Sequence, residues 1–295
     1  MKHSITGASN AYVWKECSAS PWMSKLARKF QNDKMKKGSD LHEYARELFL
    51  LRLRSIEPDD TTELVDAKGF HYSDVEAICS YVSELLKIRA PAMGIESKVY
   101  LSRAYDSFTY VDFWSFKDGV LRVVDLKTGE DPVSPVKNQQ LVYGALAILE
   151  SHALHDMKEI KLGIYQHCVN KEVTWWNISM DELTFERYTY LDQLVKIDED
   201  PEFKHGGHCR GCRAVNNCSA YANSIKVEMV APFSLTVEQR AKISADRNKV
   251  KKWVDDVHAE NLRLAQSGEV PEFMVVPGRA GTLEWVDGVV PSMVA

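Results

Sequence analysis

Three polar residues in the middle of the chain, Asp112, Asp125 and Lys127, interrupt segments that are otherwise apolar. The surrounding residues 109–116 and 120–126 are rich in Val, Phe, Trp and Leu, which predicts two largely buried strands. Two carboxylates and an ammonium group at these positions are the residues most suited to chemistry in this sequence.

The dipeptide Asp118-Gly119 between these segments predicts a two-residue hairpin turn. In a regular hairpin closed by this turn, Asp112 lies directly opposite Asp125. Side chains alternate along a strand and cross-strand neighbours share a face, so we expect Lys127 on the same side of the sheet as the two acids. A bulge would shift this register by one residue.

Opposed carboxylates repel each other and destabilise a hairpin unless a cation lies between them. Mg²⁺ or Mn²⁺ prefers oxygen ligands, lowers the pKa of bound water and polarises a phosphate. Lys127 would then orient the attacking water or neutralise charge on the phosphorus. The alternative, a solvated charged patch on an exposed sheet face, conflicts with the apolar flanks of both strands.

The remaining patterns predict an α/β fold in which helices flank a mixed central β-sheet. A short helix and its approach are expected within 9–30, and further helices from Gly38 onward and at 73–89, 138–150, 181–197 and 236–266. Strands are expected at 97–101, 109–116, 120–126, 160–169 and 172–178. We expect one domain over residues 1–222, which holds these residues, and a C-terminal helical extension and tail over residues 223–295.

The segment Val123–Gly129, preceded by Asp112, resembles the core signature of the PD-(D/E)XK nuclease superfamily. It resembles in particular the RecB-like branch, which carries a Gly-x-x-x-His element on an early helix and a Gln-x-x-x-Tyr element after the lysine. Here these elements are Gly38–His42 and Gln139–Tyr143. The resemblance implies a restriction-endonuclease-like core and a DNA nuclease.

By this resemblance, His42, Asp112 and Asp125 hold Mg²⁺ or Mn²⁺, and Lys127 is catalytic. The second acid is Asp rather than Glu, which the superfamily's name allows. RecB-like relatives commonly process DNA ends, so the resemblance further implies an exonuclease.

The same resemblance assigns Gln139 and Tyr143 to contacts with the DNA backbone or to bracing of the site. They are four residues apart and therefore lie on one helical face. Gln140 competes with Gln139 for the glutamine position, because a slip of one residue is allowed. Glu96, at the head of the preceding strand, is a candidate accessory acid.

Three of the six cysteines, Cys209, Cys212 and Cys218, fall within ten residues. Thiolates at this spacing favour Zn²⁺ or an iron–sulfur cluster. Either group needs a fourth ligand, and zinc could take His205 or His208 from the same loop.

Iron–sulfur nucleases of the RecB-like branch place one cysteine before the histidine helix and three after the nuclease core. The sequence matches that arrangement, with one cysteine upstream of His42 and three downstream. The resemblance implies a [4Fe–4S] cluster, with Zn²⁺ as the alternative. Its ligands would be Cys17, Cys209, Cys212 and Cys218.

The bulk properties are those of an ordinary globular protein of 295 residues, with 45% hydrophobic and 27% charged residues. A net charge of −5 argues mildly against a nucleic-acid partner, although metal ligands account for some of the acidity. No apolar run is long enough to span a membrane, and residues 1–14 lack a secretory pattern, so we expect a cytoplasmic protein without disulfides. Cys79 and Cys168 lie in apolar segments and are expected in the core.

The resemblance covers residues 4–222. Beyond it, Trp253, the segment Gly278–Ala280 and Trp285 resemble the tail of a phage-encoded family in the same superfamily. This second resemblance implies a phage or prophage protein in the cytoplasm of a bacterial host.

Two other functions stay open from the sequence: a non-catalytic DNA-binding or assembly protein, and a zinc-dependent binding module with an incidental hairpin. Intact Asp112, Asp125 and Lys127 argue against the first. The absence of a Gly-x-x-x-x-Gly-Lys-[Ser/Thr] motif argues against intrinsic helicase activity, whereas a helicase or recombination partner fits. Endonuclease action and an RNA substrate also stay open.

Overall fold

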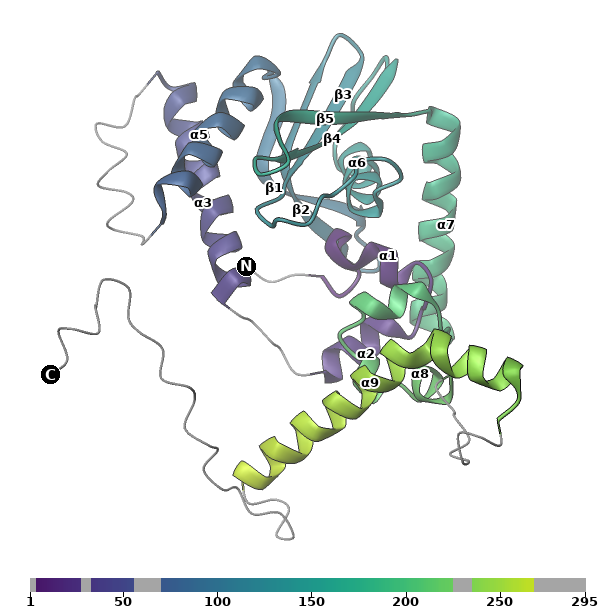
Figure 1. The fold of residues 1–295 in the computed structure, drawn as a ribbon. Helices are drawn as coiled ribbons and strands as arrows, with labels where there is room; N and C mark the ends of the chain where they lie inside the picture. Colours follow the sequence, from purple (N-terminus) through teal and green to yellow (C-terminus); the bar gives the residue numbers. More distant parts are fainter. Residues whose placement is uncertain (1–3, 28–32, 56–69, 225–234, 268–295) are drawn as a thin grey trace, which may run out of the picture. The chain divides into compact units, whose positions relative to one another are not determined.

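The structure is a computed structural model that describes residues 4–27, 33–55, 70–224 and 235–267. The chain divides into two compact units, Met1–Ser224 and Ile225–Ala295. The first unit contains a five-stranded sheet with helices on both faces, which confirms the predicted mixed α/β class (Figure 1).

The sheet carries its five strands in chain order. They are β1 (Ala92–Ser102), β2 (Ser107–Lys117), β3 (Val120–Leu126), β4 (Glu159–Gln166) and β5 (Asn170–Ile178). The first three form an antiparallel meander, β3 and β4 are parallel, and β4 and β5 form an antiparallel hairpin. The parallel pair requires a crossover, which helix α6 (Gln139–Ser151) supplies.

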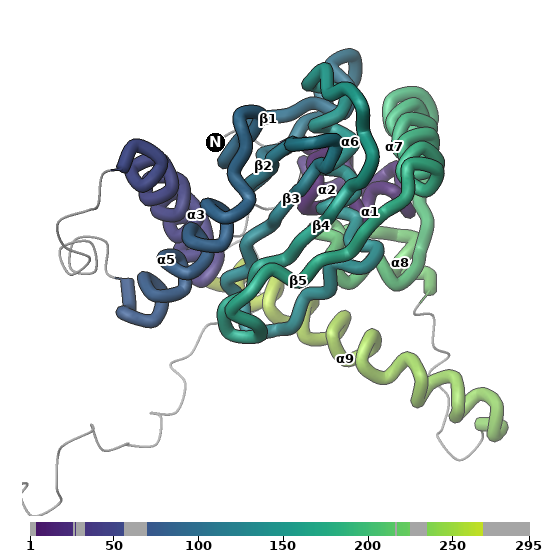
Figure 2. Tube along the Cα trace, turned by 90° about the horizontal axis from the view of Figure 1, so that it is seen from above, coloured from purple at the N-terminus to yellow at the C-terminus, as the bar shows by residue number. Residues whose placement is uncertain are grey.

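Helices α3 (Asp33–Leu53) and α5 (Tyr72–Lys87) cover one face of the sheet (Figures 1 and 2). Helices α6 and α7 (Met180–Glu199) lie on the other face. Each face therefore has its own apolar core. The sheet residues of the first core include Phe113, Val124 and Leu126, and those of the second include Val99, Val111 and Val123.

Short helical segments complete the first unit. They are η1 (Ala8–Asn10), α1 (Ala11–Trp14), α2 (Ser20–Leu26), η2 (Gly207–Gly211), η3 (Val215–Asn217) and α8 (Ser219–Ser224). Trp14 anchors α1 to the helical layer, because its ring lies 5.9 Å from that of Tyr143 and 5.2 Å from that of Tyr190.

Most of the predicted elements are confirmed to within a few residues, and two differ. The described part of α3 begins at Asp33, five residues before the predicted start. Ser39 therefore lies inside the helix and does not cap it, and its hydroxyl donates to Met35 O. Strand β1 is longer than predicted because it continues on both sides of Glu96, a residue with a positive φ of 44°.

In the second unit, the structure describes helix α9 (Val237–Gln266). Its start follows from a capping box, in which Thr236 accepts from the N–H of Gln239 and the Gln239 side chain accepts from the N–H of Thr236. The tail residues that carry the second resemblance, Gly278–Ala280 and Trp285, lie outside the described residues. Among the helices that the structure describes, none is both long and apolar enough to cross a membrane.

Candidate active site

The predicted hairpin is present and has the predicted register. Asp118 and Gly119 form the turn with φ values of 55° and 80°, both in the left-handed region that a type I′ turn requires. A side chain at Gly119 would place its Cβ 2.5 Å from Asp156 O, so only glycine fits. The paired residues run from Lys117–Val120 to Phe113–Val124, which brings Asp112 and Asp125 together at the end of the ladder.

Beyond the last paired residues of β2 and β3, a hydrogen bond from the backbone to a side chain takes the place of the backbone–backbone hydrogen bonds. Asp112 Oδ2 accepts a hydrogen bond of 2.7 Å from the N–H of Leu126. The carboxylate is thereby held in place by the neighbouring strand rather than by a flexible loop.

Glu96 faces Asp112 from the other neighbouring strand. The flanking pairs Ile95–Phe113 and Ser97–Val111 place it opposite Asp112, but Glu96 itself adopts a left-handed φ. This backbone conformation is costly for a residue with a side chain and is concentrated at functional sites.

At Glu96 and Asp112, β1 and β2 each change the face of the sheet on which their odd-numbered residues lie. Ile95 and Phe113 pack under α3 and α5, whereas Val99 and Val111 pack under α6. Strict alternation would keep the odd-numbered residues of each strand on one face. The change therefore falls at the Glu96–Asp112 pair.

Helix α3 supplies the third member of this group. Its His42 Nδ1 lies 3.0 Å from Glu96 Oε1 and 3.5 Å from Asp112 Oδ2. One ligand atom from each of the three residues lies within 4.8 Å of the others, close enough to share a single cation. Gly38, one turn earlier, lies against the loop after β3, where a Cβ would meet Thr128 Oγ1 at 3.4 Å, an ordinary contact distance.

The electrostatics of the group are dominated by its carboxylates. Burial alone would lower the pKa of His42, but Asp112 and Glu96 outweigh it and raise that pKa to about 11. Burial would raise the pKa of Asp112, but His42 and the Leu126 N–H lower it below its ordinary value. The carboxylates therefore concentrate negative charge around His42.

Asp125 and Lys127 form the second half of the site and meet helix α6. Lys127 Nζ lies 2.7 Å from Asp125 Oδ2 and donates to Gln140 Oε1 at 2.8 Å. Gln140 Nε2 in turn donates to Asp125 Oδ1 at 2.5 Å. Burial and the charge of Asp112 raise the pKa of Asp125 to about 6, despite the opposing effect of Lys127.

Gln140, and not Gln139, touches the carboxylate–lysine pair. Gln139 Oε1 instead accepts from Lys15 Nζ at 3.0 Å and from the Tyr190 hydroxyl at 2.8 Å. Tyr143 is fully buried on the Gln139 side, where its hydroxyl lies 2.8 Å from that of Ser107. Gln139 and Tyr143 thus brace α6 against its neighbours, away from the carboxylates.

Tyr81 of α5 is a site residue that the sequence analysis missed. Its hydroxyl is buried and has no hydrogen-bond partner among the described residues. Burial raises its pKa well above the ordinary value, and the charges of Asp112, Glu96 and Asp125 raise it further. In the sequence, Tyr81 is one apolar position of an amphipathic helix, so no local signal distinguished it.

The donor set fits a divalent cation. Two carboxylates and an imidazole within one coordination sphere suit Mg²⁺, Mn²⁺ or a similar ion. Asp112 also lies close enough to Asp125 to raise the pKa of Asp125. A bound cation would also remove the repulsion between the acids.

The four cysteines of the second predicted site converge. Cys17, in the turn between α1 and α2, lines one apolar pocket together with Cys209, Cys212 and Cys218. Burial and the neighbouring thiols raise the pKa of Cys212. Among the described residues, no three cysteine or histidine ligand atoms of this pocket lie within 4.8 Å of one another.

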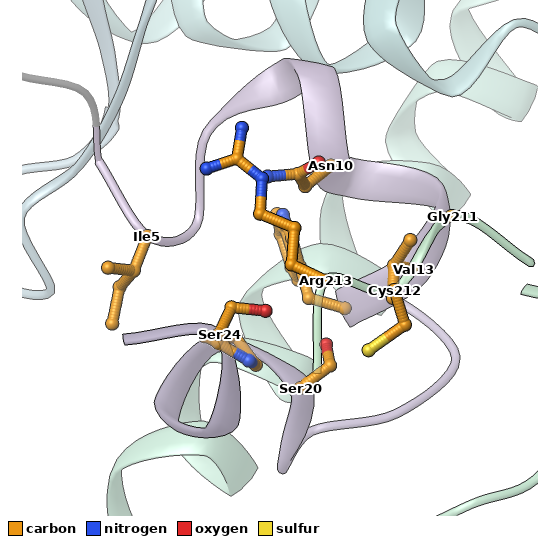
Figure 3. Close-up of a pocket in the computed structure, with 10 residues that line it drawn as sticks. Ile5, Asn10, Val13, Ser20, Ser24, Gly211, Cys212 and Arg213 are labelled. Carbon is orange, nitrogen blue, oxygen red and sulfur yellow. The ribbon is translucent and has the colours of Figure 1, made fainter. Parts of the chain in front are cut away.

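A second hollow adjoins the cysteine pocket and shows how the segments meet. Figure 3 shows Cys212 and Arg213 of the cysteine loop facing Ser20 and Ser24 of α2, with Arg213 extending towards Asn10. Residues almost two hundred positions apart in sequence therefore enclose this region.

The other two cysteines lie elsewhere. Cys79 is partly buried against the core under α3 and α5. Cys168 is exposed in the β4–β5 turn, where its thiol donates to Gly129 O at 3.1 Å, so its expected place in the core is wrong. The turn lifts it out of the sheet, whereas the apolar sequence around it suggested a longer strand.

Comparison with known proteins places this chain in a family. A family model described as "Protein of unknown function (DUF2800)" matches residues 3–289. The chain belongs to the DUF2800 family. No curated protein matches it in sequence.

Solved structures with a related shape include a "putative exonuclease" from Eubacterium rectale. The alignment has a TM-score of 0.40 and 10% sequence identity, and it covers 77% of this chain and 91% of the other.

Proposed function

We propose that the protein is a metal-dependent DNA nuclease that hydrolyses phosphodiester bonds. The proposal rests on how two groups of residues are placed relative to each other. A three-residue cation site (His42, Glu96 and Asp112) lies directly beside a buried carboxylate–lysine pair (Asp125 and Lys127). Hydrolysis of a phosphodiester needs both a cation and a nearby positive group for the developing charge.

In this proposal His42, Glu96, Asp112 and Asp125 hold Mg²⁺ or Mn²⁺. When bound, the cation supplies Lewis-acid activation of the phosphate and of water. Lys127 stabilises the negative charge that accumulates on the phosphate oxygens. Gln140 keeps both Lys127 and Asp125 in position through its two hydrogen bonds.

The resemblance to RecB-like nucleases supports the finer assignments. It favours DNA over RNA and attack from DNA ends as an exonuclease, and a helicase or recombination partner is compatible with that role. The second resemblance, that of the tail, favours a phage-encoded protein acting in the cytoplasm of its bacterial host. A catalytically silent DNA-binding or assembly protein is the alternative. DNA binding or assembly alone, however, does not require a lysine held against a buried carboxylate.

For the cysteine pocket we propose a [4Fe–4S] cluster held by Cys17, Cys209, Cys212 and Cys218. The four cysteines line one pocket, and burial and the other three thiols raise the pKa of Cys212, which supports one group shared by all four. The choice of a cluster over zinc rests on the resemblance to iron–sulfur nucleases. Its role is to join the segment before α2 to the loop after α7.

The cluster proposal is tested by purifying the protein without oxygen and measuring its iron, sulfide and zinc content and its visible spectrum. Iron and sulfide in equal amounts support the cluster. Stoichiometric zinc without iron would favour the zinc alternative.

The nuclease proposal is tested with end-labelled linear DNA and closed circular DNA, in Mg²⁺, Mn²⁺ or EDTA. Wild type should degrade linear DNA only when Mg²⁺ or Mn²⁺ is present. The Lys127→Ala variant should not degrade it under any of these conditions. Cutting of circles would replace the exonuclease assignment by an endonuclease. If wild type with its cluster intact is inert on every substrate, the silent DNA-binding alternative takes its place.

A further inference from the structure

The β1–β2 hairpin carries a group of stacked cations and aromatic rings beyond the candidate metal centre. Lys98 Nζ lies 3.7 Å from the ring centroid of Phe108 and 4.7 Å from that of Tyr100. The Arg103 guanidinium lies 4.3 Å from the Tyr100 centroid, and Tyr110 packs edge-on against Phe108 at 6.3 Å. We name these five residues the hairpin platform.

The platform lies on the same side of the sheet as His42. Val99 and Leu101 of β1 pack under α6, so the alternating Lys98 and Tyr100 point to the opposite face, the one that α3 and α5 cover elsewhere. Lys98 pairs with Tyr110 in the register. That pair is the next one on this face after Glu96 and Asp112, roughly 7 Å along the strands.

The two cations of the platform are available to a ligand. Neither Lys98 nor Arg103 forms an ion pair with any residue that the structure describes, and both are exposed. Other lysines of this unit, such as Lys37 and Lys171, are paired with acids. Cations that stack on rings instead of pairing with acids keep their charge free for phosphate.

Aromatic faces and guanidinium planes stack on bases only where the bases are unpaired. Tyr100 and Tyr110 are half-buried, so part of each residue is open to solvent. A duplex hides its base faces and would offer the platform phosphates alone. The combination of rings and free cations therefore fits a single strand better than a duplex.

We propose that the hairpin platform binds single-stranded DNA next to the candidate metal centre, with bases on the tyrosines and phosphates on Lys98 and Arg103. This inference rests on the proposed nuclease function and adds the form of substrate that the site receives. It implies that a DNA end reaches the metal centre as a separated strand.

The test is the binding of a short labelled oligothymidine to the full-length protein in EDTA, measured by fluorescence anisotropy. Lys98→Ala combined with Arg103→Ala should weaken binding about tenfold or more. It should also reduce the slope of log K against log salt by about 1.4, roughly 0.7 for each lost phosphate contact. The matched control, Lys117→Ala with Lys158→Ala, removes two exposed lysines at the opposite end of the strands and should bind like wild type.

Three results would overturn the platform: unchanged binding in the platform variant, equal loss in the control variant, or blunt duplex binding as tight as single-strand binding. Hydrolysis of a small chromogenic phosphodiester with Mn²⁺ separates the two proposals. The platform variant should hydrolyse it at the wild-type rate. If wild type does not hydrolyse it, the nuclease proposal is at fault, and the binding experiment still decides the platform.

Discussion

The carboxylate site and the cysteine pocket are built in opposite ways. The first rests on regular elements, with its ligands on α3, β1, β2 and β3, and each carboxylate already has a protein partner. The cysteines instead lie in a turn and in short 3-10 segments. The contacts of Cys17 Sγ are long, 3.6 Å to Glu202 O and 3.5 Å from the N–H of Lys204.

This difference indicates which of the two sites needs a bound group for its stability. Strands and long helices position the carboxylate site, so we expect a metal there to serve chemistry rather than folding. The cysteine loop has little regular structure of its own, so a bound group there would stabilise the fold. Substitutions in the two sites should accordingly separate activity from stability.

The largest effect is expected from Asp112→Asn. The amide can still accept from the Leu126 N–H, but it loses the charge that binds a cation. We expect DNA cleavage to fall by about 10³-fold or more, while Tm changes by only about 3 °C or less. Cleavage rates and a thermal melt of the same preparation measure the two effects. A fall of Tm as large as that of a core substitution would contradict the separation of activity from stability.

The next largest effect concerns stability, from Cys209→Ser. Loss of one ligand of the bound group should lower Tm by about 10 °C and expose the chain around the cysteine loop to protease. Cys168→Ser is the matched control, because that thiol is exposed and distant from the pocket. Equal Tm values for the two variants would contradict a stabilising role for the cysteine pocket.

A smaller effect should distinguish two neighbouring glutamines. Gln140→Ala removes the support of both Lys127 and Asp125, so we expect cleavage to slow by about 10²-fold with little change in Tm. Gln139→Ala breaks contacts to Lys15 and Tyr190, so it should lower Tm and leave the rate per folded molecule near that of wild type. The opposite outcome would return the catalytic role to Gln139.

The smallest effect is expected at Tyr81. Its buried hydroxyl has no described partner, so Tyr81→Phe removes a desolvated polar group at little cost in packing. We expect the metal-free protein to gain about 1 kcal/mol of stability, seen as a rise in Tm of about 3 °C. A drop in Tm would show that this hydroxyl has an acceptor within the site.

Local chemistry determined much of this protein from its sequence. The Asp118-Gly119 turn set the register of the β2–β3 hairpin, and with it the meeting of Asp112 and Asp125, because a two-residue turn leaves no freedom of pairing. The periodicity of apolar residues likewise predicted the helices and strands and their mixed α/β class.

Other features were decided only by the tertiary structure, because they depend on contacts between distant segments. The sequence offers Glu96 as a candidate accessory acid, but only the structure shows the left-handed backbone at this residue and its contact with His42. Gln139 and Gln140 project about 100° apart on one helix, and only the packing of α6 decides which of them faces Lys127. Cys17 reaches the cysteine loop because α1 packs against α6, a contact that no local pattern encodes.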